Sequence, residues 1–300
     1  MIDFMGRKKL WLTISAILLL ISVSSLVIRG LNLGIDFTGG NLFELRFAEA
    51  VTTGQIREVL NGLGLGNSRV QLAGEGGRDI LIRTIPLSSE QRQGLFAALR
   101  DRLGTFEEIC SEIVSPTIGR ELSWQAFLAL AIASVGMLIY ITLRFELKFA
   151  VTGIIALLHD ALITLGFFSL FQIEVDTAFV AAILTIVGYS INDTIVVYDR
   201  IRERLKERRK ETLDQVVNCS IAQTLRRSLF TSITTLLVVV AILVFGGTTI
   251  RNFVAALGVG IVSGTYSSVL VASPLWILWR QLEEGRPVEA PAGKGVRKGR

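Results

Sequence analysis

Long apolar segments dominate this chain and decide what it can fold into. Each is near or above the roughly 20 residues that a helix needs to cross the hydrocarbon core of a bilayer. A hydrophobic share of 51% in 300 residues also lies outside the ordinary soluble range. The sequence therefore predicts a membrane α-helical bundle of six transmembrane helices, with approximate bounds Leu10–Ile28, Trp124–Leu143, Phe149–Leu170, Thr177–Tyr198, Leu229–Phe245 and Phe253–Trp279.

The distribution of Lys and Arg predicts which side of the membrane each connection faces. Basic residues cluster before the first span, between the second and third, and between the fourth and fifth. By the positive-inside rule, these stretches and both termini are expected in the cytoplasm. We therefore expect residues 1–30 to be a tail and an uncleaved first helix, and residues 31–121 to be an extracytoplasmic domain. Residues 122–280 then hold five further helices with a basic cytoplasmic loop at 199–228, and residues 281–300 form a basic cytoplasmic tail.

The basic loop at 199–228 could in principle bind nucleic acid. A juxtamembrane cluster more often fixes topology or contacts anionic lipid, so membrane lipids are the expected partners and no nucleic acid is. Cys110 and Cys219 fall on opposite sides of the membrane in this topology, which excludes a disulfide between them. Neither lies beside the His or Cys expected of a metal or redox site, so we predict no metal and no cofactor.

The segment outside the membrane reads as a small α+β domain. Strand-like alternation at Asn41–Phe47, Arg69–Ala73, Asp79–Ile85 and Phe106–Val114 is interrupted by amphipathic helical patterns at Thr52–Leu63 and Ser88–Leu103. The order is βαββαβ, the split ferredoxin-like arrangement, between the first and second transmembrane helices. The domain holds no histidine and its acids are scattered, so we expect a transport or translocation protein and not an enzyme.

Asp193 is the clearest candidate for function, because it lies within the fourth apolar segment. An ionised carboxylate there costs several kcal/mol unless it faces protein, water or a counter-charge, and such residues mark ion or proton paths. The alternative is that Asp193 only hydrogen-bonds a neighbouring helix. Tyr189 and Asn192 lie close in sequence and either orient Asp193 or simply pack.

His159 and Asp160 lie together in the third apolar segment. A proton relay and structural hydrogen bonding between helices are both open for this pair. Adjacent helical residues point about 100° apart, so we do not expect both side chains to line one narrow path.

Glycines mark both connections between the membrane and the outer domain. The first, LNLGIDFTGG, holds Gly34, Asp36, Gly39 and Gly40, and the second, SPTIGREL, holds Pro116 and Gly119. Glycine permits tight turns through positive φ, so we predict a double hinge that carries a rigid outer domain.

These motifs, together with GYSINDTIVVYDRIRE in the fourth segment and RRSLFTSITTL at the fifth, give the chain a strong resemblance to the SecF family. Members of that family are accessory membrane subunits of the bacterial Sec machinery and are related to resistance-nodulation-division transporters. The resemblance covers essentially the whole chain. It implies pairing with SecD, action on preproteins at the SecYEG translocon, use of the proton-motive force, and a multi-pass location in the bacterial inner membrane.

The resemblance also assigns roles to single residues. The intramembrane acid of the family falls on Asp193, and its basic partner falls on Arg227 at the start of the fifth segment. Without the resemblance, Arg227 reads as a topology anchor. Two other functions remain open at this stage: a proton-coupled small-molecule exporter of the resistance-nodulation-division type, and a passive scaffold of the translocon.

Overall fold

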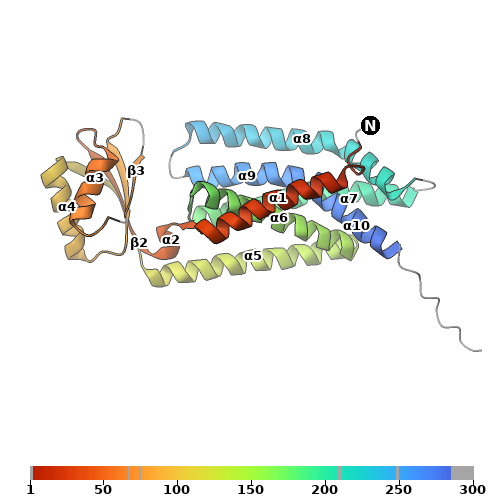
Figure 1. Cartoon of the computed structure of the whole chain (residues 1–300), viewed down its shortest axis with the longest axis horizontal. Helices are drawn as coiled ribbons and strands as arrows, with labels where there is room; N and C mark the ends of the chain where they lie inside the picture. The colour runs from red at the N-terminus through yellow and green to blue at the C-terminus, as the bar shows by residue number, and fades with distance from the viewer. Residues whose placement is uncertain (1–2, 67, 74–75, 208–210, 248–249, 285–300) are drawn as a thin grey trace, which may run out of the picture.

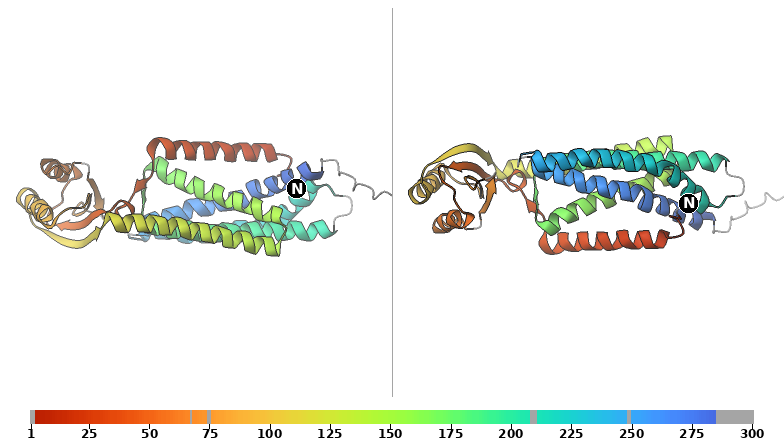
Figure 2. Two further views of the ribbon diagram at one scale, coloured as in Figure 1. Left: turned by 90° about the horizontal axis from the view of Figure 1, so that it is seen from below. Right: turned by 90° about the horizontal axis from the view of Figure 1, so that it is seen from above.

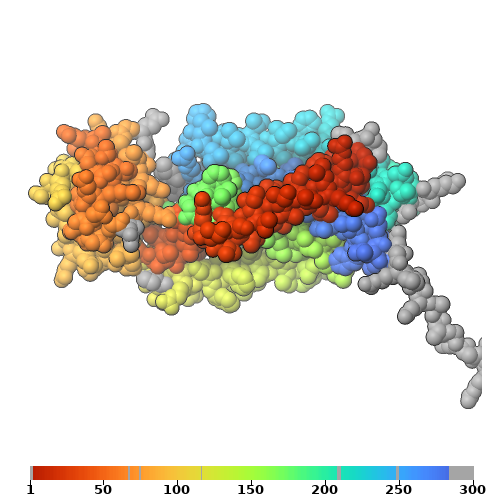
Figure 3. All heavy atoms as spheres, in the orientation of Figure 1, coloured from red at the N-terminus to blue at the C-terminus, as the bar shows by residue number. Residues whose placement is uncertain are grey.

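The computed structural model describes residues 3–66, 68–73, 76–207, 211–247 and 250–284. It divides into an elongated helical bundle and a smaller α+β lobe at one end of it (Figure 1, Figure 3). The described residues contain six helices long and apolar enough to span a membrane, as the sequence predicts. They are α1 Lys8–Arg29, α5 Pro116–Arg144, α6 Leu147–Phe171, α7 Thr177–Glu207, α8 Leu213–Phe245, and a continuous last span made of α9 Arg251–Ser267, the π-helical turn Ser268–Ala272 and α10 Ser273–Glu284.

The three spans α6, α7 and α9–α10 form the centre of the bundle. About half of the most apolar part of each is buried inside the protein, whereas α1, α5 and α8 bury less than a fifth of theirs. Figure 2 shows α1 and α5 at opposite sides of the bundle. At the inner end, Phe149 stacks on Trp276 at 4.8 Å between ring centroids and contacts Tyr198 at 4.7 Å. Central helices that are buried on most sides can hold polar side chains away from lipid, which is where such residues are expected.

Glycine lets the central helices approach closely. A Cβ at Gly264 on α9 would lie 2.9 Å from the Cβ of Ser190 on α7, and one at Gly260 would lie 2.3 Å from Ile186. Small residues at helix interfaces are how membrane helices pack without a hydrophobic driving force between them. This packing brings polar residues of α7 and α9 to the same level.

The segment 199–228 is not the loop that the sequence predicts. Helix α7 continues to Glu207, and α8 begins at Leu213 behind a capping box formed by Thr212 and Gln215. The charged stretch extends the apolar helices beyond the membrane, because Arg, Lys and Glu are good helix formers in water. Residues 208–210 and 285–300, the latter most of the predicted basic tail, lie outside the described residues.

The outer lobe has the element order expected from the sequence: β2 Gly40–Phe47, α3 Thr53–Gly62, β3 Arg69–Ala73, β4 Asp79–Thr84, α4 Ser89–Leu103 and β5 Phe106–Val114. Its strands form an antiparallel sheet in the order β3-β4-β2-β5. Alternate residues of β2, Phe43, Leu45 and Phe47, are buried with side chains of α3 and α4. Both helices begin with capping boxes, at Thr52–Gln55 and Ser88–Gln91.

A second, two-stranded sheet lies between the lobe and the bundle, and no sequence pattern predicts it. Strand β1, Asn32–Leu33, follows α1 and pairs in parallel with β6, Glu174–Val175, which precedes α7. The short helix α2, Ile35–Thr38, comes next and packs against α5. Two-residue strands carry no detectable periodicity, which is why this joint escapes sequence analysis.

Candidate functional site

The most developed polar site in the bundle surrounds Asp160 on α6. The side chain is 1% exposed, and its two carboxylate oxygens accept hydrogen bonds from three serines. Ser190 on α7 and Ser267 on α9 donate to Oδ2, and Ser263 on α9 donates to Oδ1, each at 2.7 Å. One carboxylate therefore ties the three central helices together at a single level.

Helix geometry explains why two of these serines converge. Ser263 and Ser267 are four residues apart, so they lie on the same face of α9. Gly264 between them allows Ser190 on α7 to come close. The sequence does contain this signal, since SGTYS interrupts an apolar span, but nothing in it relates those serines to an acid a hundred residues earlier.

His159 contacts Asp160 directly, and the expectation that the two do not line one narrow path stays a prediction. His159 Nδ1 lies 3.0 Å from Asp160 Oδ1. The divergence of 100° applies to the Cβ directions, but Nδ1 is near the backbone and Asp160 can turn toward it. The other ring nitrogen, Nε2, is buried and has no hydrogen-bond partner among the described residues. The ring centroid is 6.1 Å from that of Tyr266, whose hydroxyl meets Ser15 Oγ on α1 at 2.5 Å.

Asp193 lies one turn of α7 beyond Ser190 and is 5% exposed. Its Oδ2 is buried and finds no hydrogen-bond donor within the described part of the chain. Ser228 of α8 lies beside the carboxyl group, and its buried hydroxyl also has no partner of good geometry there. A buried carboxylate oxygen without a hydrogen-bond donor costs free energy and calls for an explanation.

Arg227 is exposed, and within the described ranges no ion pair joins it to Asp193. The expected partner residues are thus near one another but not in contact in this conformation. Tyr189 also makes a different contact, since its hydroxyl lies 3.3 Å from Thr235 Oγ1 on α8. Asn192 is exposed on the surface of the bundle.

The predicted hinge residues form an ordered joint. Asp36 Oδ2 accepts hydrogen bonds from Thr177 N and Oγ1, both at 2.8 Å, and so caps the outer end of α7. The amide of Gly34 donates to Val175 O at 2.8 Å, between β1 and β6. A Cβ at Gly119 would lie 2.5 Å from Phe37 O, so the two connections pack on each other.

Gly39 and Gly40 have φ of +71° and +149°, which favour glycine. A Cβ at Gly40 would also lie 2.4 Å from Thr84 O. Pro116 is the first residue of α5, the position in which proline is preferred. Whether this joint bends remains a prediction.

The described residues include no group of three or more His, Cys, Asp or Glu that could hold a metal ion. The bundle holds two buried carboxylates on adjacent helices. Asp160 accepts hydrogen bonds from hydroxyl groups at both oxygens, whereas one oxygen of Asp193 has no donor among the described residues.

Comparison with known proteins gives this arrangement a family. Residues 96–282 match the family described as protein export membrane protein SecD/SecF, C-terminal, and residues 24–51 match the SecD/SecF GG motif. The chain is 42% identical to the protein translocase subunit SecF of Sebaldella termitidis, over 94% of this chain and 93% of that protein. The chain belongs to the SecF family.

Some relatives of this chain are longer proteins named SecDF, and the chain matches only part of each. The chain is 39% identical to the protein translocase subunit SecDF of Bacillus subtilis, over 94% of this chain but 38% of that protein. The crystal structure of SecDF from Thermus thermophilus, described as a translocon-associated membrane protein, is 38% identical. It matches with a TM-score of 0.85 over 93% of this chain and 39% of its own. A SecDF structure in a super-membrane-facing form matches with a TM-score of 0.72 over 94% of this chain and 39% of its own. This SecF-type chain thus corresponds to about two fifths of a SecDF protein.

Proposed function

We propose that the chain is an accessory subunit of the Sec protein-export machinery. Acting with SecD, it uses the proton-motive force to promote translocation of preproteins and their release on the outer side of the membrane. The export role follows from the SecF family. The observation that supports the proton role is that Asp193 is a buried carboxyl group in a membrane span and that one of its oxygens has no hydrogen-bond donor among the described residues.

The proton step takes place between α7 and α8. Asp193 faces Ser228 in this conformation, and Arg227 lies one residue away on α8 without pairing with it. A movement that brings Arg227 to Asp193 replaces a hydroxyl neighbour by a positive charge, and the two environments bind a proton with different affinity. One charge that crosses 100 mV supplies about 2.3 kcal/mol, enough to shift a conformational equilibrium.

The same proposal places the chain in the bacterial inner membrane with both termini in the cytoplasm. Lys and Arg residues gather at the start of α1 and the last turns of α5 and α7, which lie at the end of the bundle opposite the outer lobe (Figure 1). A basic end supports a cytoplasmic assignment. The lobe, which we assign to the ferredoxin-like class, then lies outside, where it can meet preproteins that emerge from SecYEG.

Two other functions make different predictions in one experiment. Proteoliposomes that contain SecYEG, SecD and this chain are loaded with a preprotein, and its release is measured with and without an imposed proton gradient. A proton-driven subunit raises release only with the gradient, and a passive scaffold raises it equally in both. A small-molecule exporter of the resistance-nodulation-division type leaves release unchanged. Stimulation that survives a protonophore would overturn the proposal.

A further inference from the structure

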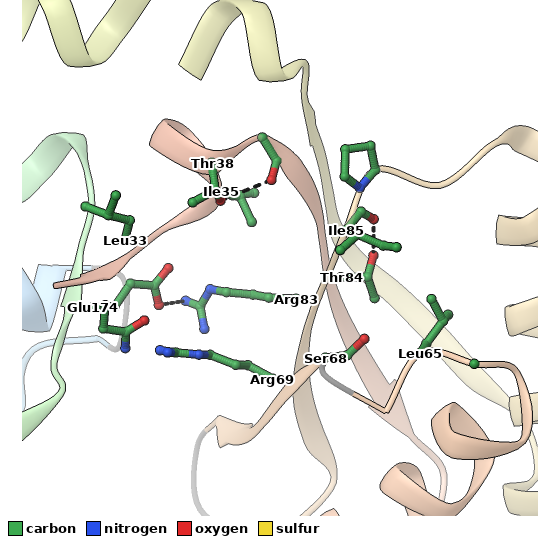
Figure 4. Close-up of a pocket in the computed structure, with 14 residues that line it drawn as sticks. Leu33, Ile35, Thr38, Leu65, Ser68, Arg69, Arg83, Thr84, Ile85 and Glu174 are labelled. Carbon is green, nitrogen blue, oxygen red and sulfur yellow. Dashed lines mark hydrogen bonds and ion pairs between the residues drawn. The ribbon is translucent and has the colours of Figure 1, made fainter. Parts of the chain in front are cut away.

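The outer lobe is fastened to the bundle by one ion pair. Arg83 Nη2 on β4 lies 2.9 Å from Glu174 Oε2 on β6, and the two side chains are only 18% and 9% exposed (Figure 4). No other ion pair among the described residues joins the lobe to the bundle. A groove of about 310 Å³ adjoins the pair and is lined in part by Arg69, Asn32 and Thr84.

Glu174 is held in a fixed place relative to α7. Its strand β6 ends one residue before Asp176, and α7 begins at Thr177. A Cβ at Gly34 would lie 2.8 Å from Glu174 Oε1, which shows how closely the residue after β1 approaches this side chain. Glu174 therefore moves with the outer end of α7.

Asp36 provides a second attachment at the same place. Its carboxylate caps the first turn of α7 through Thr177, and it belongs to the connection that leads into the lobe. Both attachments of the lobe thus end on one helix. Thr177 is about 24 Å along α7 from Asp193, at 1.5 Å per residue, and a helix transmits displacement over that length as a rigid rod.

We propose that Arg83 and Glu174 are positioning residues that couple displacement of α7 to the outer lobe. A buried ion pair regains little net free energy after desolvation but is demanding in geometry, which suits a contact that sets position. This inference rests on the proposed function only in that displacement of α7 is taken to promote export. The position of the lobe is measured by a spin-label distance, which does not depend on export.

Spin labels at Gln93→Cys on α4 and Phe171→Cys at the end of α6 report the position of the lobe. Both positions are exposed, and Cys110→Ser and Cys219→Ser remove the native thiols. In lipid nanodiscs the parent protein should give a narrow distribution of the distance between the two labels. Glu174→Arg places a third positive charge beside Arg83 and Arg69, and the repulsion should broaden that distribution.

The swapped variant Arg83→Glu/Glu174→Arg re-forms the ion pair and should narrow the distance distribution again. We expect Glu174→Arg to lower proton-dependent release several-fold, and the swapped variant to recover it. The matched control is Asp79→Asn, which removes the Arg46–Asp79 ion pair inside the lobe and leaves the distribution unchanged. A Glu174→Arg distribution as narrow as that of the parent overturns the inference. If gradient-dependent release persists in that variant, the proposed function stands although the inference about Arg83 and Glu174 fails.

Discussion

At the scale of single residues, the two buried carboxyl groups differ in how they are satisfied. Three serine hydroxyls and the imidazole of His159 surround Asp160, so we propose that it holds α6, α7 and α9 in place. Asp193 has a buried oxygen with no donor in the described part of the chain. A proton on that oxygen would remove the buried charge and make the oxygen a donor, and a new partner could serve the ionised form, which is why we assign the coupling step to Asp193 and not to Asp160.

Asp160→Ala should destabilise the protein, because it leaves buried hydroxyls without their acceptor. Each unsatisfied group costs roughly 1–3 kcal/mol, but serine hydroxyls can turn to carbonyls of their own helix, so we expect a total loss of about 2–4 kcal/mol. Thermal unfolding in mild detergent measures the effect. Ser273→Ala, at a buried serine that does not contact Asp160, is the control. An unfolding midpoint equal to that of the wild type would contradict the assigned role.

At the scale of elements, α7 connects the features of the molecule that carry function. Its first residue donates hydrogen bonds to Asp36, its middle carries Ser190 and Asp193, and its last turns form a charged helix. Sequence patterns predict this span well, because apolar length is decisive. They miss its charged extension to Glu207, since a run of positive charge is also typical of a loop, and they miss β1 and β6, which are too short to show a pattern.

Removal of the cap should loosen the first turn of α7. Asp36→Ala leaves the amide of Thr177 without its acceptor, at a cost of about 1 kcal/mol, whereas Asp36→Asn keeps a side-chain oxygen there. Hydrogen exchange of peptides that cover the start of α7 should rise about fivefold in the alanine variant, which is that free energy expressed as an opening constant. Equal exchange in all three proteins would exclude the capping role.

At the scale of the whole molecule, the lobe and the bundle meet at a packed joint made of both connections. The sequence predicts the two parts and the glycines between them, because membrane spans and strand alternation are local patterns. It does not predict that the connections pack on each other at Phe37 and Gly119, or that Ser263 and Ser267 reach Asp160. Those contacts join residues far apart in the chain, and their geometry depends on how the helices pack.

Gly119→Val tests the joint, because its side chain would collide with the backbone of Phe37 and separate α2 from α5. We expect faster proteolysis at both connections and weaker proton-dependent release. Gly136→Val on the same helix is the matched control, since a Cβ there has open space around it. Loss of release in both variants to the same degree would argue that the joint has no special role.

The central claim is that Asp193 couples the proton gradient to export, and release of a preprotein from proteoliposomes with an imposed gradient tests it most directly. Asp193→Asn keeps the volume of the side chain but cannot ionise, whereas Asp199→Asn makes the same change at an exposed position of the same helix. We predict that Asp193→Asn inserts and assembles with SecD but shows no stimulation by the gradient, and that Asp199→Asn is stimulated like the wild type. Full stimulation of the Asp193→Asn protein would contradict the account.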